Sequence, residues 1–208
     1  MNLNSLLNQV LNTVQKGSGK PAAGSNDLLG SLGKGALAAS LVSMLLKKKN
    51  TGSLVKVGSM AALGMVAYKA YQNWQQNNPA QSVPQQSAFE PVGQAAEEHS
   101  RIVLRTMIAA AASDGLIDEA EKQLIEQESG EDTAIARWLA AEYAAPATVA
   151  DIAREVGGNH ALAAEVYLAA RVVCGELSRK EIVFLAQLAA ALQLDDQLVD
   201  KLEQQLGL

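Results

Sequence analysis

Four carboxylates stand close together in one short stretch of the 208-residue chain: Asp114, Asp118, Glu119 and Glu121. Clustered carboxylate oxygens are the donors that a hard divalent cation such as calcium prefers, and calcium takes about six to eight of them. A cation held by Asp114, Asp118 and Glu121 could stabilise the fold, or act as a Lewis acid in a hydrolase. The spacing lacks the full Asp-x-Asp-x-Asp-Gly order of a calcium-binding loop.

The same residues also have an explanation that needs no metal. Gly115 suits the left-handed conformation that ends a helix. Asp118 and Glu121 have the spacing of a capping box, in which an N-cap side chain and a carboxylate three residues later satisfy the first amides of a helix. The stretch then reads as a helix, a break and a second helix.

This helix–break–helix pattern occurs twice. Residues 107–126 align without gaps on residues 167–186, sixty positions later. The second copy keeps the glycine and both capping residues, as Gly175, Ser178 and Glu181. Cys174 stands where Asp114 would be, so capping explains both copies and a metal site explains one. We therefore prefer capping, keep the cation as the alternative, and expect the two copies to pack together.

The region from residue 95 to the end has helical periodicity in almost every window and no strand signal, which predicts an all-α bundle of about seven helices. In the first of them, the candidate core residues are Ile102, Val103, Met107 and Ile108. The expected helices cover residues 96–113, 118–128, 132–144, 148–156, 161–174, 178–192 and 195–206.

Charge divides the chain into two unlike parts. Residues 1–80 carry eight lysines and one acid, a net charge of +7, whereas residues 81–208 carry nine basic and twenty-one acidic residues, a net charge of −12. The acidic part lacks the basic surface that binds nucleic acid, so we expect no nucleic-acid partner. The basic part could contact anionic lipid.

Residues 28–72 are predicted to contact membrane lipid. Two apolar segments, residues 28–46 and 54–71, approach the roughly twenty residues that a membrane-spanning helix needs. An aromatic cluster of Tyr68, Tyr71 and Trp74 at one end is typical of a membrane interface. Small residues recur four apart in both segments, which allows self-association through close helix faces. The alternative is a pair of helices buried in a soluble assembly.

The remaining N-terminal parts are simpler. Residues 1–27 are expected to form a short amphipathic helix, lying on a membrane or a partner, and a flexible linker. Residues 73–94 are rich in proline and glutamine, a composition that predicts a disordered linker with the domain boundary inside it.

Other chemically capable side chains favour structural roles. His99 and His160 lack metal-ligand spacing and are expected at the surface or at a helix cap. Cys174 has no neighbouring histidine and is expected to be a small buried side chain. Trp138 and Tyr143 have helical spacing and are expected in the core or at a partner contact.

The repeated stretch supports a family resemblance. IAAAASDGLIDEAEKQLI (residues 108–125) resembles the first signature of the TerB-like (tellurite-resistance) superfamily, and residues 161–194 resemble its C-terminal half. An apolar N-terminal region, a linker and this domain together resemble the YebE-like inner-membrane proteins, a family of unknown function. The resemblance implies an all-helical domain, the bacterial inner membrane, a link to stress responses, and a metal-binding surface at Asp114, Asp118 and Glu121. The second copy departs from the family pattern at residues 174–177.

These observations lead to two functional hypotheses. The first is a non-enzymatic, membrane-tethered module whose acidic helical domain binds a partner protein, with a possible link to a divalent cation and to stress. The second is a metal-dependent hydrolase that uses Asp114, Asp118 and Glu121. The sequence has neither a phosphate-binding loop nor a Gly-x-Ser-x-Gly elbow, and we expect no cofactor other than a divalent cation. The side of the membrane on which the acidic domain lies stays open.

Overall fold

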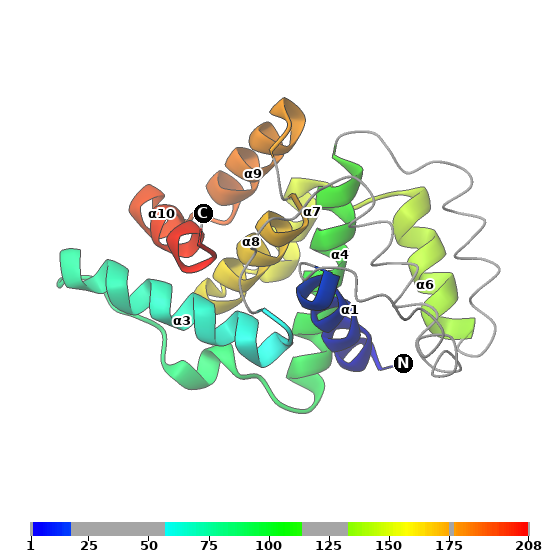
Figure 1. Cartoon of the computed structure of the whole chain (residues 1–208), viewed down its shortest axis with the longest axis horizontal. Helices are drawn as coiled ribbons and strands as arrows, with labels where there is room; N and C mark the ends of the chain where they lie inside the picture. The colour runs from blue at the N-terminus through cyan, green and yellow to red at the C-terminus, as the bar shows by residue number, and fades with distance from the viewer. Residues whose placement is uncertain (1, 18–56, 114–132, 175–176, 208) are drawn as a thin grey trace.

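A computed structural model of the chain describes residues 2–17, 57–113, 133–174 and 177–207. They form α-helices and one short 3-10 helix, with no strand among them, which confirms the predicted all-α fold (Figure 1). The elements are α1 (Leu3–Gly17), α3 (Met60–Asn77), η1 (Gln86–Phe89), α4 (Gln94–Ala112), α6 (Thr133–Ala144), α7 (Val149–Val156), α8 (His160–Cys174), α9 (Arg179–Ala191) and α10 (Asp196–Gln205).

Side-chain caps explain why the helices begin where the sequence predicts. The Thr148 side chain accepts a hydrogen bond from the Asp151 amide and so opens α7. Asp195 opens α10 by accepting from the amides of Gln197 and Leu198. These bonds satisfy amides that have no partner inside the helix.

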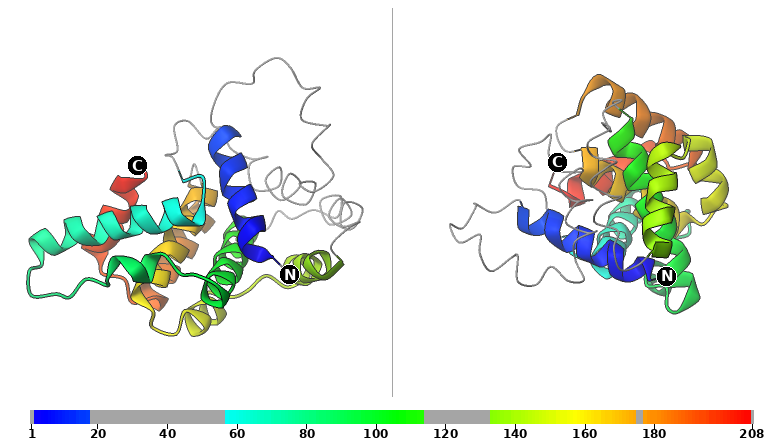
Figure 2. Two further views of the ribbon diagram at one scale, coloured as in Figure 1. Left: turned by 90° about the horizontal axis from the view of Figure 1, so that it is seen from below. Right: turned by 90° about the vertical axis from the view of Figure 1, so that its right-hand side faces the viewer.

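The centre of the fold is α8. Every residue from Ala161 to Cys174 is buried, as expected for a helix whose side chains are mostly apolar on every side. Its neighbours are α3, α4, α7, α9, α10 and η1. Figure 1 shows α8 in the middle of the labelled helices, and Figure 2 gives two further views of the same arrangement. The side chain of Cys174 is fully buried, as predicted. The packing of α4 on α8 brings together the first helices of the two repeat copies.

The first predicted core residues are also confirmed. On α4, Ile102, Val103, Met107 and Ile108 are all buried. On α6, Tyr143 is buried and Trp138 packs partly buried against the core. Arg105 joins α4 to its neighbours, because its guanidinium pairs with Glu142 of α6 at 2.8 Å and with Glu155 of α7.

The structure differs from the linker predicted over residues 73–94. Helix α3 continues through Asn77, and Phe89, at the end of η1, is 1% exposed. Composition predicted disorder because polar residues dominate the segment, but two large aromatic side chains, Trp74 and Phe89, anchor it to the core. Residues 57–113 therefore pack as one continuous part of the helical fold.

The aromatic cluster predicted for a membrane interface lies inside the protein. The rings of Tyr68 and Tyr71 contact Phe89, with centroids 5.6 and 5.7 Å apart. The Tyr71 hydroxyl donates to the backbone carbonyl of His160, and the Trp74 indole donates to Asp195. The polar atoms of Tyr71 and Trp74 thus have protein partners, which replace the water or lipid headgroup expected from the sequence.

Helix α1 is amphipathic, as predicted, but its apolar side lies on the protein itself. Leu7, Val10 and Leu11 are fully buried, and α1 packs on α3 and α4. Glu97 of α4 accepts from the Leu3 amide at 2.8 Å and so caps the beginning of α1. These contacts explain the position of α1 without a membrane.

None of the helices that the structure describes combines the length and the apolar composition needed to cross a bilayer. The second apolar segment, predicted over residues 54–71, contributes the first part of α3, where Leu63, Ala67 and Ala70 are fully buried. The first apolar segment, residues 28–46, lies outside the described ranges.

Candidate functional site

The first copy of the repeated corner lies outside the described residues, and with it Asp114, Asp118 and Glu121. The second copy confirms the capping prediction. The Ser178 side chain accepts from the Glu181 amide at 3.3 Å, and the Glu181 carboxylate accepts from the Ser178 amide at 2.8 Å. Within the described ranges, no three His, Cys, Asp or Glu side chains are grouped to hold a metal ion.

If the two copies share this capping role, Ser178→Ala and Asp118→Ala should each lower the unfolding free energy by about 1 kcal/mol, with or without calcium. Asp114→Ala should change it little, because Asp114 is not part of the capping box. Thermal melts of the full chain in calcium and in chelator would measure these effects. A melting temperature that rises with calcium in the wild type, and not in Asp114→Ala, would instead assign the corner to a metal.

A groove between α9 and α10 has a volume of about 410 Å³ and is lined by described residues. Its α9 wall is apolar. The exposed residues Ile182 and Leu177 are 50% and 38% solvent-accessible, and alanines follow them along the same side of the helix. The apolar lining residues are Leu177, Ile182, Leu185, Ala186, Ala189, Ala190, Leu194 and Val199.

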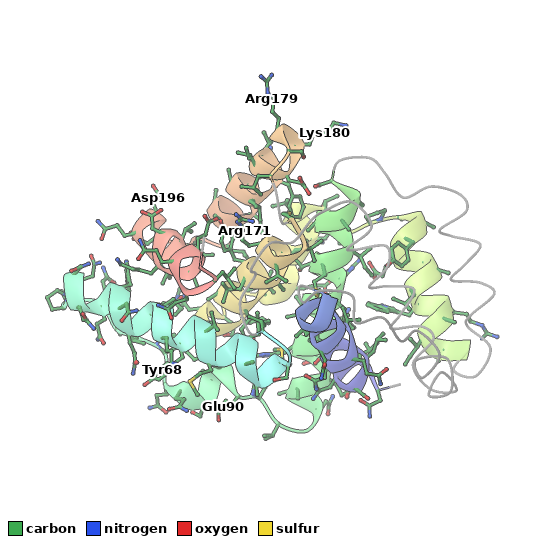
Figure 3. All side chains as sticks on the ribbon, viewed as in Figure 1. Tyr68, Glu90, Arg171, Arg179, Lys180 and Asp196 are labelled. Carbon is green, nitrogen blue, oxygen red and sulfur yellow. The ribbon has the colours of Figure 1, made fainter. Side chains whose placement is uncertain are left out.

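The α10 wall of this groove is acidic. Asp196, Asp200 and Glu203 all line it, and their spacing of four and three residues places them on one face of α10. Asp196 lies at the outer end of α10, whereas Arg179 and Lys180 project from the far tip of α9 (Figure 3). The groove therefore has an apolar wall facing a carboxylate wall.

At the floor of the groove, Glu203 is already engaged. The Tyr167 hydroxyl donates to Glu203 Oε1 at 2.8 Å, and Arg171 Nε lies 3.3 Å from the same oxygen. Burial, together with this hydrogen bond, raises the pKa of Tyr167, so the phenol keeps its proton and stays a donor. The carboxylates left for a ligand are Asp196 and Asp200.

A second polar feature is buried between α4 and α8. The carboxylate of Glu165 is fully buried, and its Oε2 lies 3.6 Å from Nδ1 of His99, whose side chain is 12% exposed. Neither carboxylate oxygen has a hydrogen-bond partner among the described residues. Burial raises the pKa of Glu165 from 4.5 to about 7, and the neighbouring His99 opposes that shift.

Neither feature was predicted from the sequence, although the sequence contains a signal for the buried pair. His99 was expected at the surface or at a cap, whereas it contacts a buried carboxylate; His160 does lie exposed, at the beginning of α8. Glu165 stands in an otherwise apolar run, a warning that a charge is buried. The groove had no such signal, because its residues come from three helices that meet only in the fold.

Comparison with protein families assigns the chain to a family. A family model described as "Protein of unknown function (DUF533)" matches residues 31–206. The chain belongs to the DUF533 family. The match takes in every helix from α3 to α10, so the groove and the buried pair both lie within the family region. No curated protein and no solved structure matches the chain.

Proposed function

We propose that this DUF533 protein is a non-enzymatic, membrane-tethered module that binds a partner protein in the groove between α9 and α10. The observation that carries the proposal is the exposed apolar side of α9, which faces the acidic side of α10. Large apolar side chains at a concave surface with a polar rim are typical of protein-interaction sites. Ile182 is the natural anchor, since it is half exposed and lines the groove.

Site-specific photocrosslinking in cells tests this proposal. A photoreactive residue at Ala186, which lines the groove, should give an adduct of defined mass. The same residue at Gln187, exposed on the same helix and outside the groove, should not. Adding Ile182→Gln should abolish the Ala186 adduct, because it removes the apolar anchor. The absence of an Ala186 adduct, or identical adducts from both positions, would contradict the proposal.

The membrane tether rests on the first apolar segment. Residues 28–46 hold one charged residue, Lys34, and lysines 47–49 follow directly, which supports insertion near a negatively charged lipid surface. We expect the full chain to stay in the membrane fraction after carbonate extraction. A chain lacking residues 28–49 should be released, because α3 and α1 bury their apolar sides within the protein. Release of the full chain would contradict the tether.

We further propose that the helical domain is TerB-like and that the protein lies at the bacterial inner membrane, as the resemblance in the sequence implies. A domain of this kind at a membrane would link an apolar N-terminal region to an acidic binding surface, in keeping with a role in stress responses. The hydrolase hypothesis depends on Asp114, Asp118 and Glu121 holding a metal. A calcium-dependent melting temperature, abolished by Asp114→Ala, would favour that hypothesis over capping.

A further inference from the structure

We infer that the partner segment in the α9/α10 groove is an amphipathic helix with a lysine- or arginine-rich polar face. The inference rests on the proposed function and names the chemistry of the partner. Helix-in-groove binding places the apolar side of one helix against a hydrophobic trough and lets flanking charges set its orientation. In this groove the α9 wall supplies the hydrophobic trough and the α10 wall supplies the charges.

The apolar wall is shaped for helix packing. Ile182, Ala186 and Ala190 follow one another at four-residue spacing along α9, so they form one stripe. The alanines make the stripe shallow beyond Ile182, which allows a second helix to approach closely. The cavity of about 410 Å³ holds a few large side chains, as the anchor positions of one helix face would provide.

The acidic wall selects the charge of the partner. Asp196 and Asp200 stand one turn apart on α10, and neither has a hydrogen bond or ion pair through its side chain within the described ranges. Like charges at this spacing destabilise a helix. The α10 dipole explains an acid at Asp196, in the first turn, but gives no stabilisation to Asp200 further along. A cationic side chain above both carboxylates would relieve the repulsion.

Charge also disfavours the other occupants of an apolar groove. Residues 81–208 carry a net charge of −12, so a second copy of the acidic domain would approach against repulsion. Anionic lipid and nucleic acid would meet the same field. A basic helix is attracted by it, and its binding should weaken as salt screens the carboxylates.

Fluorescence anisotropy with the purified full chain in non-ionic detergent tests the inference. The probe is a labelled synthetic peptide of about 18 leucine and lysine residues with helical period, and its match is the same peptide with glutamate for lysine. We expect the lysine peptide to bind at least about tenfold more tightly, and D196N/D200N to remove about tenfold of its affinity and flatten its salt dependence. Ile182→Gln should weaken both peptides.

Matched controls keep the result specific to the groove. E90Q/E98Q makes the same change in net charge at exposed acids away from the groove, and should leave binding unchanged. Val183→Gln alters a neighbouring apolar residue that is 54% exposed and does not line the groove, and should also be neutral. Equal binding of both peptides, or equal losses in the control variants, overturns the basic-helix inference.

The two proposals fail in different ways. If the Ala186 crosslink persists while the peptides show no charge preference, the groove binds a partner but the partner is not a basic helix. If the crosslinked adduct has twice the mass of the chain, a second copy fills the groove and the inference is overturned. If Ala186 gives no adduct at all, the proposed function itself fails.

Discussion

Replacing Glu165 with glutamine is expected to stabilise the protein increasingly as the pH rises from about 5 to about 8. Burial raises the pKa of this carboxyl from 4.5 to about 7, and the side chain has no hydrogen-bond partner among the described residues to offset the loss of water. Glutamine has nearly the same shape and cannot ionise. The variant therefore removes the cost of burying the charge while keeping the packing of α8.

The sign follows from the proton balance. Below pH 4.5 the carboxyl is protonated in both the folded and the unfolded chain, so its ionisation does not affect stability. Between 4.5 and about 7 the unfolded chain loses the proton first, so the wild type loses stability as the pH rises through this window. Above 7 the penalty is complete, and the interval from 4.5 to about 7 corresponds to about 3 kcal/mol.

Urea unfolding of the wild type and Glu165→Gln across this pH range would measure the effect. The difference between their unfolding free energies should grow with pH, whereas the difference between the wild type and Glu98→Gln, an exposed acid on α4, should stay flat. His99→Gln should move the transition to higher pH, because His99 lowers the pKa of Glu165. A pH-independent difference for Glu165→Gln would show that Glu165 is not buried as a carboxylate.

The helices could be predicted from the sequence because their signals are local. Apolar period and capping residues are read within a few positions, which is why α7 begins after Thr148 and α9 after Ser178, as expected. Gly157, whose φ is 59°, ends α7 at the predicted break, since only a left-handed residue closes the helix in this way. The predicted boundaries of α4 and α8 differ from the observed ones by about two residues or fewer.

Features that depend on distant contacts could not be predicted in the same way. His99 and Glu165 meet only because α4 packs on α8, and no local pattern pairs them. Residues 54–71 have the composition of a membrane helix, and the sequence alone does not show that α8 and α10 cover the helix they begin. The groove adds a further requirement, because α9 and α10 must be turned so that Ile182 and Asp200 line the same recess.

Gly64→Ala is expected to destabilise the protein by about 2 kcal/mol or more, although alanine has a higher helix propensity than glycine. Alanine favours a helix over glycine by about 1 kcal/mol, and Gly64 lies inside α3. A Cβ at this position, however, would lie 2.1 Å from the backbone carbonyl oxygen of Phe89 and 3.0 Å from Oε1 of Glu165. A backbone carbonyl cannot rotate away, so α3 must separate from η1 and α8.

The destabilisation caused by the clash should exceed the stabilisation from the higher helix propensity of alanine. Urea unfolding would then show a lower midpoint with an unchanged slope. The matched control is Ala61→Gly, at an exposed position of the same helix, which should cost no more than about 1 kcal/mol. The result also distinguishes an α3 that packs in the folded domain from one that spans a bilayer. A bilayer-spanning helix over residues 54–71 would not hold Gly64 against Phe89, so alanine would be neutral or stabilising there. A stabilised Gly64→Ala variant would contradict the packing of α3 on the core, and a strongly destabilised one would place this helix within the folded domain.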